Sequence, residues 1–245
     1  MKNSLNKSQI ERFSRQLVLK NIGPKGQKKI LSSKVLIVGI GGLGCPAAEN
    51  LVRAGIGTIG LIDNDTVNLS NIHRQSLFNS KDIKKPKVNV AAKKLKEINP
   101  LTIIKTYKSR LNQNNINQII KNYEIIIDGT DNFKTKFLIN DYCLKYKKKL
   151  VTGAISKFDG HIFTFNFKDN KTASLKSFYQ EKEISDDILN CEFEGVLGTT
   201  ASIVGTTQAN EALKMLMEIG QNLKNQILII DLLNLNFRKV KYKKK

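Results

Sequence analysis

Three glycines near the start of the chain have the spacing of a phosphate-binding loop. Gly39, Gly41 and Gly44 follow a short apolar run and open a segment whose apolar residues recur at helical spacing. Such a loop lets the backbone approach phosphate groups, and the first turn of the helix presents unpaired N–H groups to negative charge. Asp63 stands 19 residues after Gly44, at the end of the next apolar run, where its carboxylate can accept hydrogen bonds from ribose hydroxyls. These residues favour a nucleotide site over a loop whose glycines only turn the chain.

Two cationic residues, Arg74 and Lys87, follow Asp63 closely in the sequence. A triphosphate that is attacked at phosphorus is stabilised by cations clamped on its oxygens. The two cations beside a ribose-binding carboxylate therefore indicate a nucleoside triphosphate.

Two carboxylates, Asp128 and Asp131, end a later apolar run. In a parallel sheet, ligands bind at the carboxyl ends of the strands, so these side chains are expected at the same edge as the glycine loop. Mg²⁺ typically takes one or two protein carboxylates together with phosphate oxygens. The pattern predicts a magnesium site at this edge.

The elements that must position these residues alternate between strand and helix patterns over about the first 150 residues. Strands are predicted at 35–38, 59–63, 101–107, 123–128, 150–152 and 161–167, and the longest late helix at 195–219. Because parallel strands need crossover connections, we predict an α/β fold: a Rossmann-like, doubly wound, mostly parallel sheet with helices on both faces. Strands at 228–231 and 237–242 are expected to extend the sheet in antiparallel fashion.

One domain over residues 1–245 is expected, because the sequence contains no repeats and no low-complexity linker. Within it, the segment 1–10 is predicted to be a flexible N-terminus and 171–193 a mobile loop.

The composition indicates a soluble cytoplasmic protein. Its three cysteines lie far apart, and no apolar stretch is long enough for a signal peptide or a membrane span, so neither disulfides nor a membrane partner is expected. The formal net charge of +20 favours anionic ligands and partners. Since lysine is spread along the whole chain rather than gathered with aromatic residues, we expect no nucleic-acid partner.

Taken together and in order, these motifs resemble the ThiF/MoeB/HesA family, the bacterial relatives of ubiquitin-activating enzymes. Nine segments carry the resemblance: ERFSRQLVL (11–19), GIGGLG (39–44), DNDTV (63–67), LSNIHRQ (69–75), PK (86–87), TDN (130–132), TGA (152–154), GVLG (195–198) and QA (208–209).

The resemblance implies ATP and Mg²⁺ as cofactors. The residues that it would place around ATP are Gly39, Gly41, Gly42, Gly44, Asp63, Asp65, Asn71, Arg74, Gln75 and Lys87. Asp131 would hold Mg²⁺ and, with Arg74 and Lys87, belong to the catalytic residues. Arg15 corresponds to a family arginine that reaches ATP from the neighbouring subunit, so a homodimer is implied.

The implied activity is adenylylation of the C-terminal carboxylate of a small ubiquitin-like sulfur-carrier protein that ends in Gly-Gly. The products would be an acyl adenylate, which then accepts sulfur, and pyrophosphate. A ThiS-like carrier would serve thiamine synthesis and a MoaD-like carrier molybdopterin synthesis. The family's loop cysteine is present as Cys191 and no rhodanese-like extension is present, which favours the thiamine branch.

The sequence departs from the family at the structural zinc, which most relatives hold with two C-x-x-C pairs. Ser174 and Ser177 stand where the first pair belongs, and the chain ends at Lys245 before a second pair. A hydroxyl is a poor substitute for a thiolate ligand, so no zinc is predicted. Apolar contacts between the region around Phe178 and the last strand would have to close this part of the fold.

The three cysteines are expected to differ in role. Cys191 is a candidate for acyl or sulfur transfer, although Glu192 and Glu194 would raise the pKa of its thiol. Cys45 and Cys143 are interpreted as packing residues.

Two other functions are compatible with parts of the pattern. An NAD-dependent oxidoreductase would use the glycine loop and Asp63, but would not explain Arg15, Arg74, Lys87 and Asp131 together. A non-catalytic relative that only binds a carrier would account for the missing zinc ligands, yet the charged positions expected to contact ATP are all present.

Overall fold

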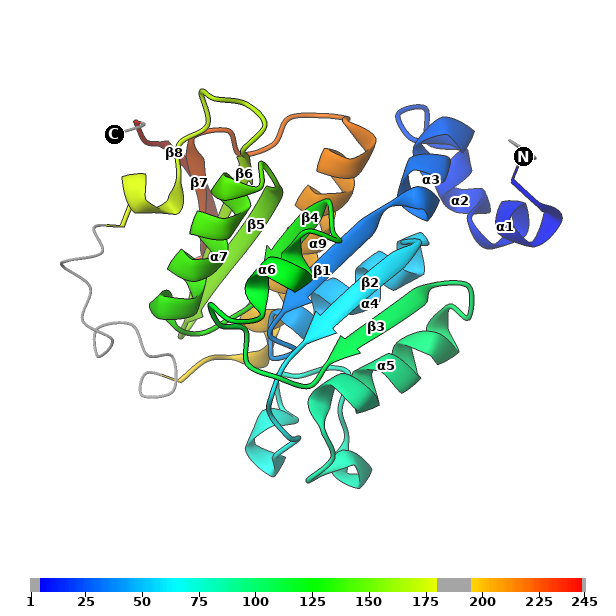
Figure 1. Ribbon diagram of the computed structural model, residues 1–245, viewed down its shortest axis with the longest axis horizontal. Coiled ribbons are helices and arrows are strands. Elements are labelled where there is room, and N and C mark those ends of the chain that lie inside the picture. The colour runs from blue at the N-terminus through cyan, green and yellow to red at the C-terminus, as the bar shows by residue number, and fades with distance from the viewer. Residues whose placement is uncertain (1–4, 180–194, 244–245) are drawn as a thin grey trace.

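The fold is built around an eight-stranded sheet, as seen in a computed structural model whose described residues are 5–179 and 195–243 (Figure 1). The strands are β1 (Lys34–Val38), β2 (Thr58–Ile62), β3 (Ile103–Tyr107), β4 (Ile125–Asp128), β5 (Lys149–Ser156), β6 (Asp159–Asn166), β7 (Gln226–Asp231) and β8 (Asn236–Lys241). Their order across the sheet is β3-β2-β1-β4-β5-β6-β7-β8. The pairs from β3 to β5 are parallel, and those from β5 to β8 are antiparallel.

The parallel strands at the centre of the sheet are continuous apolar runs because both of their faces are covered. All residues of β2 and β4 are buried, and so is β1 after its first residue. In β1, Val35 and Ile37 face one apolar cluster, while Leu36 and Val38 face the other. This division places the core in two layers, one on each side of the sheet.

The helices cover both faces. The main ones are α3 (Gly23–Ser32), α4 (Gly44–Ala54), α5 (Lys87–Ile98), α6 (Ile116–Ile120), α7 (Phe133–Lys145) and α9 (Gly198–Met217). Buried residues of α3, α4, α5 and α9 belong to one cluster, and those of α6 and α7 to the other (Figure 1). Short elements complete the described residues: α1 (Lys7–Arg12), α2 (Ser14–Leu17), and the 3-10 turns η1 (Leu69–Asn71), η2 (Ser80–Asp82) and η3 (Leu175–Ser177).

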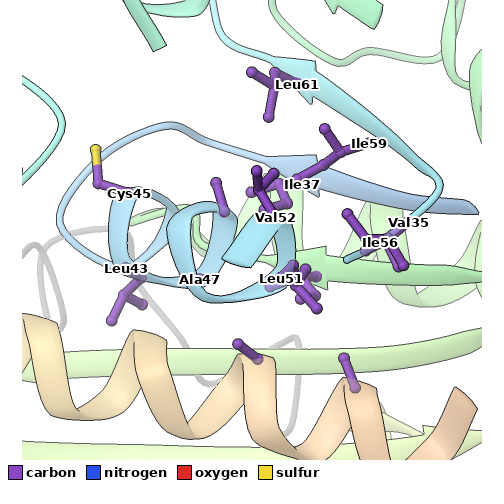
Figure 2. Close-up of a cluster of buried hydrophobic side chains, with 14 of the residues drawn as sticks. Val35, Ile37, Leu43, Cys45, Ala47, Leu51, Val52, Ile56, Ile59 and Leu61 are labelled. Atoms are coloured by element: carbon purple, nitrogen blue, oxygen red, sulfur yellow. The ribbon is translucent and has the colours of Figure 1, made fainter. Parts of the chain in front are cut away.

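The first helix after the glycine cluster packs tightly on the neighbouring strands. Figure 2 shows Val52 of α4 beside Ile37 of β1, Leu51 on the side of α4 that faces the neighbouring helix, and Cys45 at the start of α4. Gly55 ends α4 in the left-handed conformation, with φ of 95°, which glycine adopts without a steric penalty. The helix therefore has a fixed start beside the glycine loop and a fixed end.

Aromatic rings close the antiparallel end of the sheet. The ring of Phe163 on β6 lies 5.1 Å from that of Phe178 and 5.9 Å from that of Tyr242, centroid to centroid. Phe178 and Tyr242 are also in edge contact at 5.7 Å. The predicted contact between the Phe178 region and the end of the chain is thus confirmed.

The predicted fold class is confirmed, including the antiparallel strands at the C-terminal end. One boundary needs correction: residues 7–10, expected to be part of a flexible terminus, are helical because Asn6 and Gln9 form a capping box that starts α1. Of the expected loop 171–193, the part up to 179 contains η3, and the rest lies outside the described residues. Among the described helices, none combines the length and apolar character required to cross a membrane.

Candidate active site

The glycine loop lies at the point where the strand order of the sheet reverses. The chain leaves β1 toward β2 on one side, while β4 pairs with β1 on the other. The amide of Gly129, which follows β4, donates to the carbonyl of Val38 at 2.9 Å. Such a switch point opens a crevice at the carboxyl ends of the strands and is where open α/β sheets bind ligands.

Two glycines of the loop are required by close backbone contacts. A Cβ on Gly44 would lie 1.9 Å from the carbonyl oxygen of Gly39, and Gly39 itself has φ of 85°. At Gly41, in contrast, the nearest atom to an added Cβ would be the side-chain Nε2 of Gln75, at 3.7 Å. The loop is therefore closed toward the helix and accessible at Gly41, as a phosphate cradle requires.

Asp63 ties the end of β2 to the glycine loop. Its Oδ2 accepts from the amide of Ile40 at 2.7 Å and its Oδ1 from the amide of Asp65 at 2.8 Å. Burial raises the pKa of Asp63 above its ordinary value, while these two backbone donors and Lys87 oppose the rise. Each carboxylate oxygen keeps a further lone pair, so Asp63 can also accept from ribose hydroxyls.

Lys87 is buried at the start of α5, and its ammonium group lies beside the Asp63–Asp65 segment. Its Nζ lies 3.0 Å from Oδ2 of Asp65, and only 6% of its side chain is exposed, against 57% for Asp65. A buried ammonium is costly unless it is paired, and Asp65 supplies the pair. Lys87 is therefore held beside Asp63 in a position to exchange or share its partner with a phosphate.

The segment 69–75 lies beside the glycine loop and supplies three of the predicted residues. A Cβ on Gly42 would be 3.6 Å from Cγ of Arg74, whose Nη1 donates to the carbonyl of Ser70 at 2.8 Å. Asn71 caps η1 by accepting from the amide of Asn68 at 3.2 Å. These contacts place Arg74 along the loop and make Asn71 a residue that shapes the segment.

Gln75 provides a test of whether a nucleotide fits these residues. It is 3% exposed and reaches toward Gly41, yet its Oε1 has no hydrogen-bond partner among the described residues. An unsatisfied buried acceptor is costly, and a nucleotide carries donors that can satisfy it, such as ribose hydroxyls and the adenine amino group. The cationic groups, the accessible glycine and the unpaired acceptor together fit a nucleoside triphosphate.

The proposed magnesium ligand lies at the same edge of the sheet. Asp131 is exposed, three residues after the end of β4, and its Oδ1 accepts only a weak 3.3 Å hydrogen bond from the neighbouring Asn132 amide group. An exposed carboxylate is the donor type that Mg²⁺ prefers when it also binds phosphate oxygens. The donor chemistry therefore fits the ion.

Arg15 is not brought to this site within one chain. It is exposed on α2, and its neighbour Gln16 donates to the carbonyl of Ala54, at the end of α4 opposite the glycine loop. With 11 residues, α4 is about 16 Å long. A contact between Arg15 and the nucleotide would have to come from a second subunit.

The cysteines fall into two groups. Burial raises the pKa of the Cys45 thiol to about 12 and that of Cys143 well above its ordinary value, so both are unreactive packing residues, as predicted. Cys191 lies outside the described residues.

At the position of the first zinc pair, Ser174 caps η3. Its amide donates to the hydroxyl of Ser177 at 3.4 Å, as part of a capping box that joins the two residues. The two side chains that would be thiolates in a zinc-binding relative thus serve a local turn.

The side chains that surround Asp128 form a network that the sequence did not predict. Asp128 is 1% exposed and paired with Lys136 of α7, which is 4% exposed, at 3.2 Å. Thr152 donates to the same carboxylate oxygen of Asp128 at 2.5 Å. The signal was present in the motifs at 130–132 and 152–154, but only three-dimensional contact shows that they meet.

The structure defines a doubly wound α/β fold with a candidate ligand site at the switch point between β1 and β4. The chain belongs to the ThiF family, whose model matches residues 13–245. Solved structures of E. coli MccB share the fold: the form with ATP has a TM-score of 0.82 and 20% identity, covering 96% of this chain and 72% of that one. PaaA is comparable, with a TM-score of 0.83, 21% identity and coverage of 99% and 76%.

Sequence relatives carry the names of adenylyltransferases. The chain is 36% identical to a sulfur carrier protein adenylyltransferase of Thermus thermophilus over 96% of this chain and 88% of the relative. It is 38% identical to a probable molybdopterin-synthase adenylyltransferase of Gracilaria tenuistipitata, covering 97% of this chain and 66% of the relative. It is 38% identical to the adenylyltransferase and sulfurtransferase MOCS3 of Drosophila virilis, covering 99% of this chain and 53% of the relative. The chain thus spans between about half and nine-tenths of the length of these relatives.

Proposed function

We propose that this protein uses ATP to adenylylate the C-terminal carboxylate of a small ubiquitin-like sulfur-carrier protein. The observation that carries the proposal is the meeting of the glycine loop, Asp63 and the buried cation of Lys87 at the switch point of the sheet. The names of the relatives, adenylyltransferases of sulfur carriers or of molybdopterin synthase, support the same reaction.

In the proposed reaction, a carboxylate oxygen of the carrier's last glycine attacks the α-phosphorus of ATP. A bond forms between that oxygen and phosphorus, the bond from the α-phosphorus to the bridging oxygen breaks, and pyrophosphate leaves. Because the carboxylate is already ionised, no side chain has to remove a proton. The chain's contribution is to orient the nucleotide and to neutralise charge on the phosphates, through Arg74 and Lys87.

Mg²⁺ is the cofactor that the proposed site would hold, with Asp131 as the protein ligand. When bound, the ion neutralises part of the charge of the phosphate oxygens. Asp63 serves the ribose end of the nucleotide, where the hydroxyls offer donors, and Gln75, beside Gly41, offers the nucleotide an unpaired acceptor.

The proposed partner is a carrier that ends in Gly-Gly. The net charge of +20 would steer an acidic carrier toward this chain. Relatives with sulfur-carrier and molybdopterin names both occur, so the proposal covers a ThiS-like and a MoaD-like carrier alike. Affinity capture from the native cell, followed by the mass of the bound small protein, identifies which of them is used.

A homodimer belongs to the proposal because Arg15 lies at the far end of α4 in its own chain. In a dimer of the proposed kind, Arg15 of one subunit contacts the phosphates in the other. Mixing an inactive Arg15→Ala subunit with an inactive Lys87→Ala subunit should restore part of the activity, since each mixed dimer contains one site with both residues intact.

The proposal is tested by ATP–pyrophosphate exchange in the presence of purified carrier. Exchange is expected with the intact carrier and Mg²⁺, and not with a carrier that lacks its last glycine. Absence of exchange with both ThiS-like and MoaD-like carriers would instead support a non-catalytic carrier-binding relative. Protection against thermal unfolding by NAD and not by Mg-ATP would support an oxidoreductase.

A further inference from the structure

The carboxylate of Asp128 is fully engaged by groups of the protein itself. Its Oδ2 accepts from Thr152 Oγ1 at 2.5 Å and from Lys136 Nζ at 3.2 Å. Its Oδ1 accepts from the amide and the hydroxyl of Thr130, at 3.0 and 2.6 Å. A carboxylate has about four lone-pair sites, so these four hydrogen bonds leave Asp128 no capacity for a metal ion.

The network clamps the end of β4 from both faces of the sheet. On one face, Lys136 of α7 also donates to the carbonyl of Gly153 at 2.6 Å, which joins β4 to β5. From the α9 side, Gln208 donates to the main-chain carbonyl of Asp128 at 2.8 Å. A Cβ on Gly153 would lie 2.8 Å from the Gln208 side chain, so this approach requires glycine.

Such an arrangement is better suited to fixing geometry than to stabilising the fold. A buried ion pair is often no more stabilising than packed apolar groups of the same size, because both charges are desolvated. The ion pair instead orients Thr130, because Asp128 accepts hydrogen bonds from both the amide and the hydroxyl of that residue. Gly129 before it is bonded to Val38, and Asp131 directly after it is exposed.

We propose that Asp128 is a positioning residue which, held by Lys136 and Thr152, fixes Thr130 and thereby sets the place of the Asp131 carboxylate relative to the glycine loop. The proposal rests on the proposed function, because it takes Asp131 as the ligand of the magnesium that accompanies ATP. It also gives a role to Thr130, Thr152 and Gln208, which lie in the motifs at 130–132, 152–154 and 208–209 and take part in no proposed chemical step.

The test compares Thr152→Val with Thr152→Ser. Valine removes the hydroxyl that holds Asp128 and keeps the shape of the side chain, whereas serine keeps the hydroxyl. The readout is binding of Mn²⁺, measured by electron paramagnetic resonance of the free ion, in the presence of a non-hydrolysable ATP analogue. Loss of a group that orients a metal ligand typically weakens metal binding about 10- to 100-fold, so the valine variant is expected to lose about tenfold and the serine variant to bind as the wild type.

A second position and a control keep the test decisive. Thr130→Val removes the 2.6 Å hydrogen bond from the Thr130 hydroxyl to Asp128, at a half-buried residue. It should weaken Mn²⁺ binding as Thr152→Val does. Thr102→Val removes an equally buried hydroxyl, bonded to the Ile56 carbonyl at 2.9 Å beside the amino end of β3, and should leave Mn²⁺ binding unchanged. Binding of the analogue in the presence of a chelator should be the same in all variants.

The outcomes separate this inference from the proposed function. Normal Mn²⁺ binding in Thr130→Val or in folded Thr152→Val overturns the positioning role, as does equal weakening in Thr102→Val. If the wild-type protein binds neither the analogue nor Mn²⁺ with it, the nucleotide assignment itself fails, before any variant is compared.

Discussion

The two ends of the sheet are held by different kinds of contact. At the carboxyl edge of the parallel strands, the buried or half-buried charges of Asp63, Lys87 and Asp128 are satisfied by hydrogen bonds and ion pairs. At the antiparallel end, aromatic rings around Phe163 close the structure by packing against one another. Buried charge is expensive for folding, so the charged groups at the carboxyl edge are consistent with a ligand site, whereas the rings at the antiparallel end contribute apolar packing.

The largest effect on stability is expected from Phe163→Ala. Phe163 is 2% exposed and is in ring contact with Phe165, Phe178, Tyr179 and Tyr242. Truncating a buried phenylalanine typically costs about 3–5 kcal/mol of unfolding free energy, because apolar contacts are lost and a cavity remains. Urea denaturation measures it. Phe237→Ala is the matched control: Phe237 is 52% exposed on β8, and its loss should stay within about 0.5 kcal/mol. Equal effects at both positions would contradict the role given to the ring cluster.

The next largest effect is expected on activity, from a change at the carboxyl edge of the parallel strands. Lys87→Ala should lower the rate of carrier-dependent pyrophosphate exchange by about 10²- to 10³-fold, the usual loss on removing one group that stabilises developing charge. Lys94→Ala is the control, because Lys94 lies on the same helix and is also paired, with Asp82 at 2.6 Å, without facing the glycine loop. Exchange at the wild-type rate in Lys87→Ala would remove the electrostatic basis of the assignment.

The sequence was sufficient to predict the parallel half of the fold, because β2, β4 and all of β1 after its first residue are buried and therefore read as apolar runs. The glycine loop and Asp63 could also be located, since the spacing of glycines reflects backbone geometry. In contrast, α1 could not be predicted, because its start depends on the Asn6 cap and it contains no buried residue to give a periodic pattern.

The candidate site was predictable where one residue acts alone and not where residues act as a network. Lys136 was unremarkable in the sequence, since a lysine on a helix is usually solvent-exposed. It is buried here only because β4 places Asp128 opposite it, a contact between elements that periodicity does not encode. For the same reason the partner of Lys87 at Asp65, 22 residues away, could not be read from spacing.

A smaller effect is expected in the pH dependence of stability. Burial, the largest cause, raises the pKa of Asp63, so the folded protein binds this proton more tightly than the unfolded chain does. As the pH falls from neutrality through the raised pKa toward the ordinary value of 3.8, the folded state gains stability from this group. As the pH is lowered across that window, the unfolding free energy of the wild type should therefore rise relative to that of Asp63→Asn. A difference that is constant with pH would show that the carboxylate is solvated as in the unfolded chain.

The smallest effect, none at all, is expected on chelation of zinc. A structural zinc contributes folding energy outright, on the order of 10–16 kcal/mol in small zinc-binding peptides, so its removal would lower the melting temperature strongly. In this protein, aromatic packing between Phe178 and Tyr242 closes the antiparallel end, and Ser174 and Ser177 cap a turn. Dialysis of tag-free protein against a zinc chelator should therefore leave the melting temperature unchanged.

The double variant Ser174→Cys, Ser177→Cys makes the test sharper, since it restores one pair of thiolates. Two ligands are too few for a tetrahedral structural site, so this variant should also purify without stoichiometric zinc. A wild-type protein that carries one zinc per chain would mean that the antiparallel end is held by a metal after all, and that the aromatic cluster only packs around it.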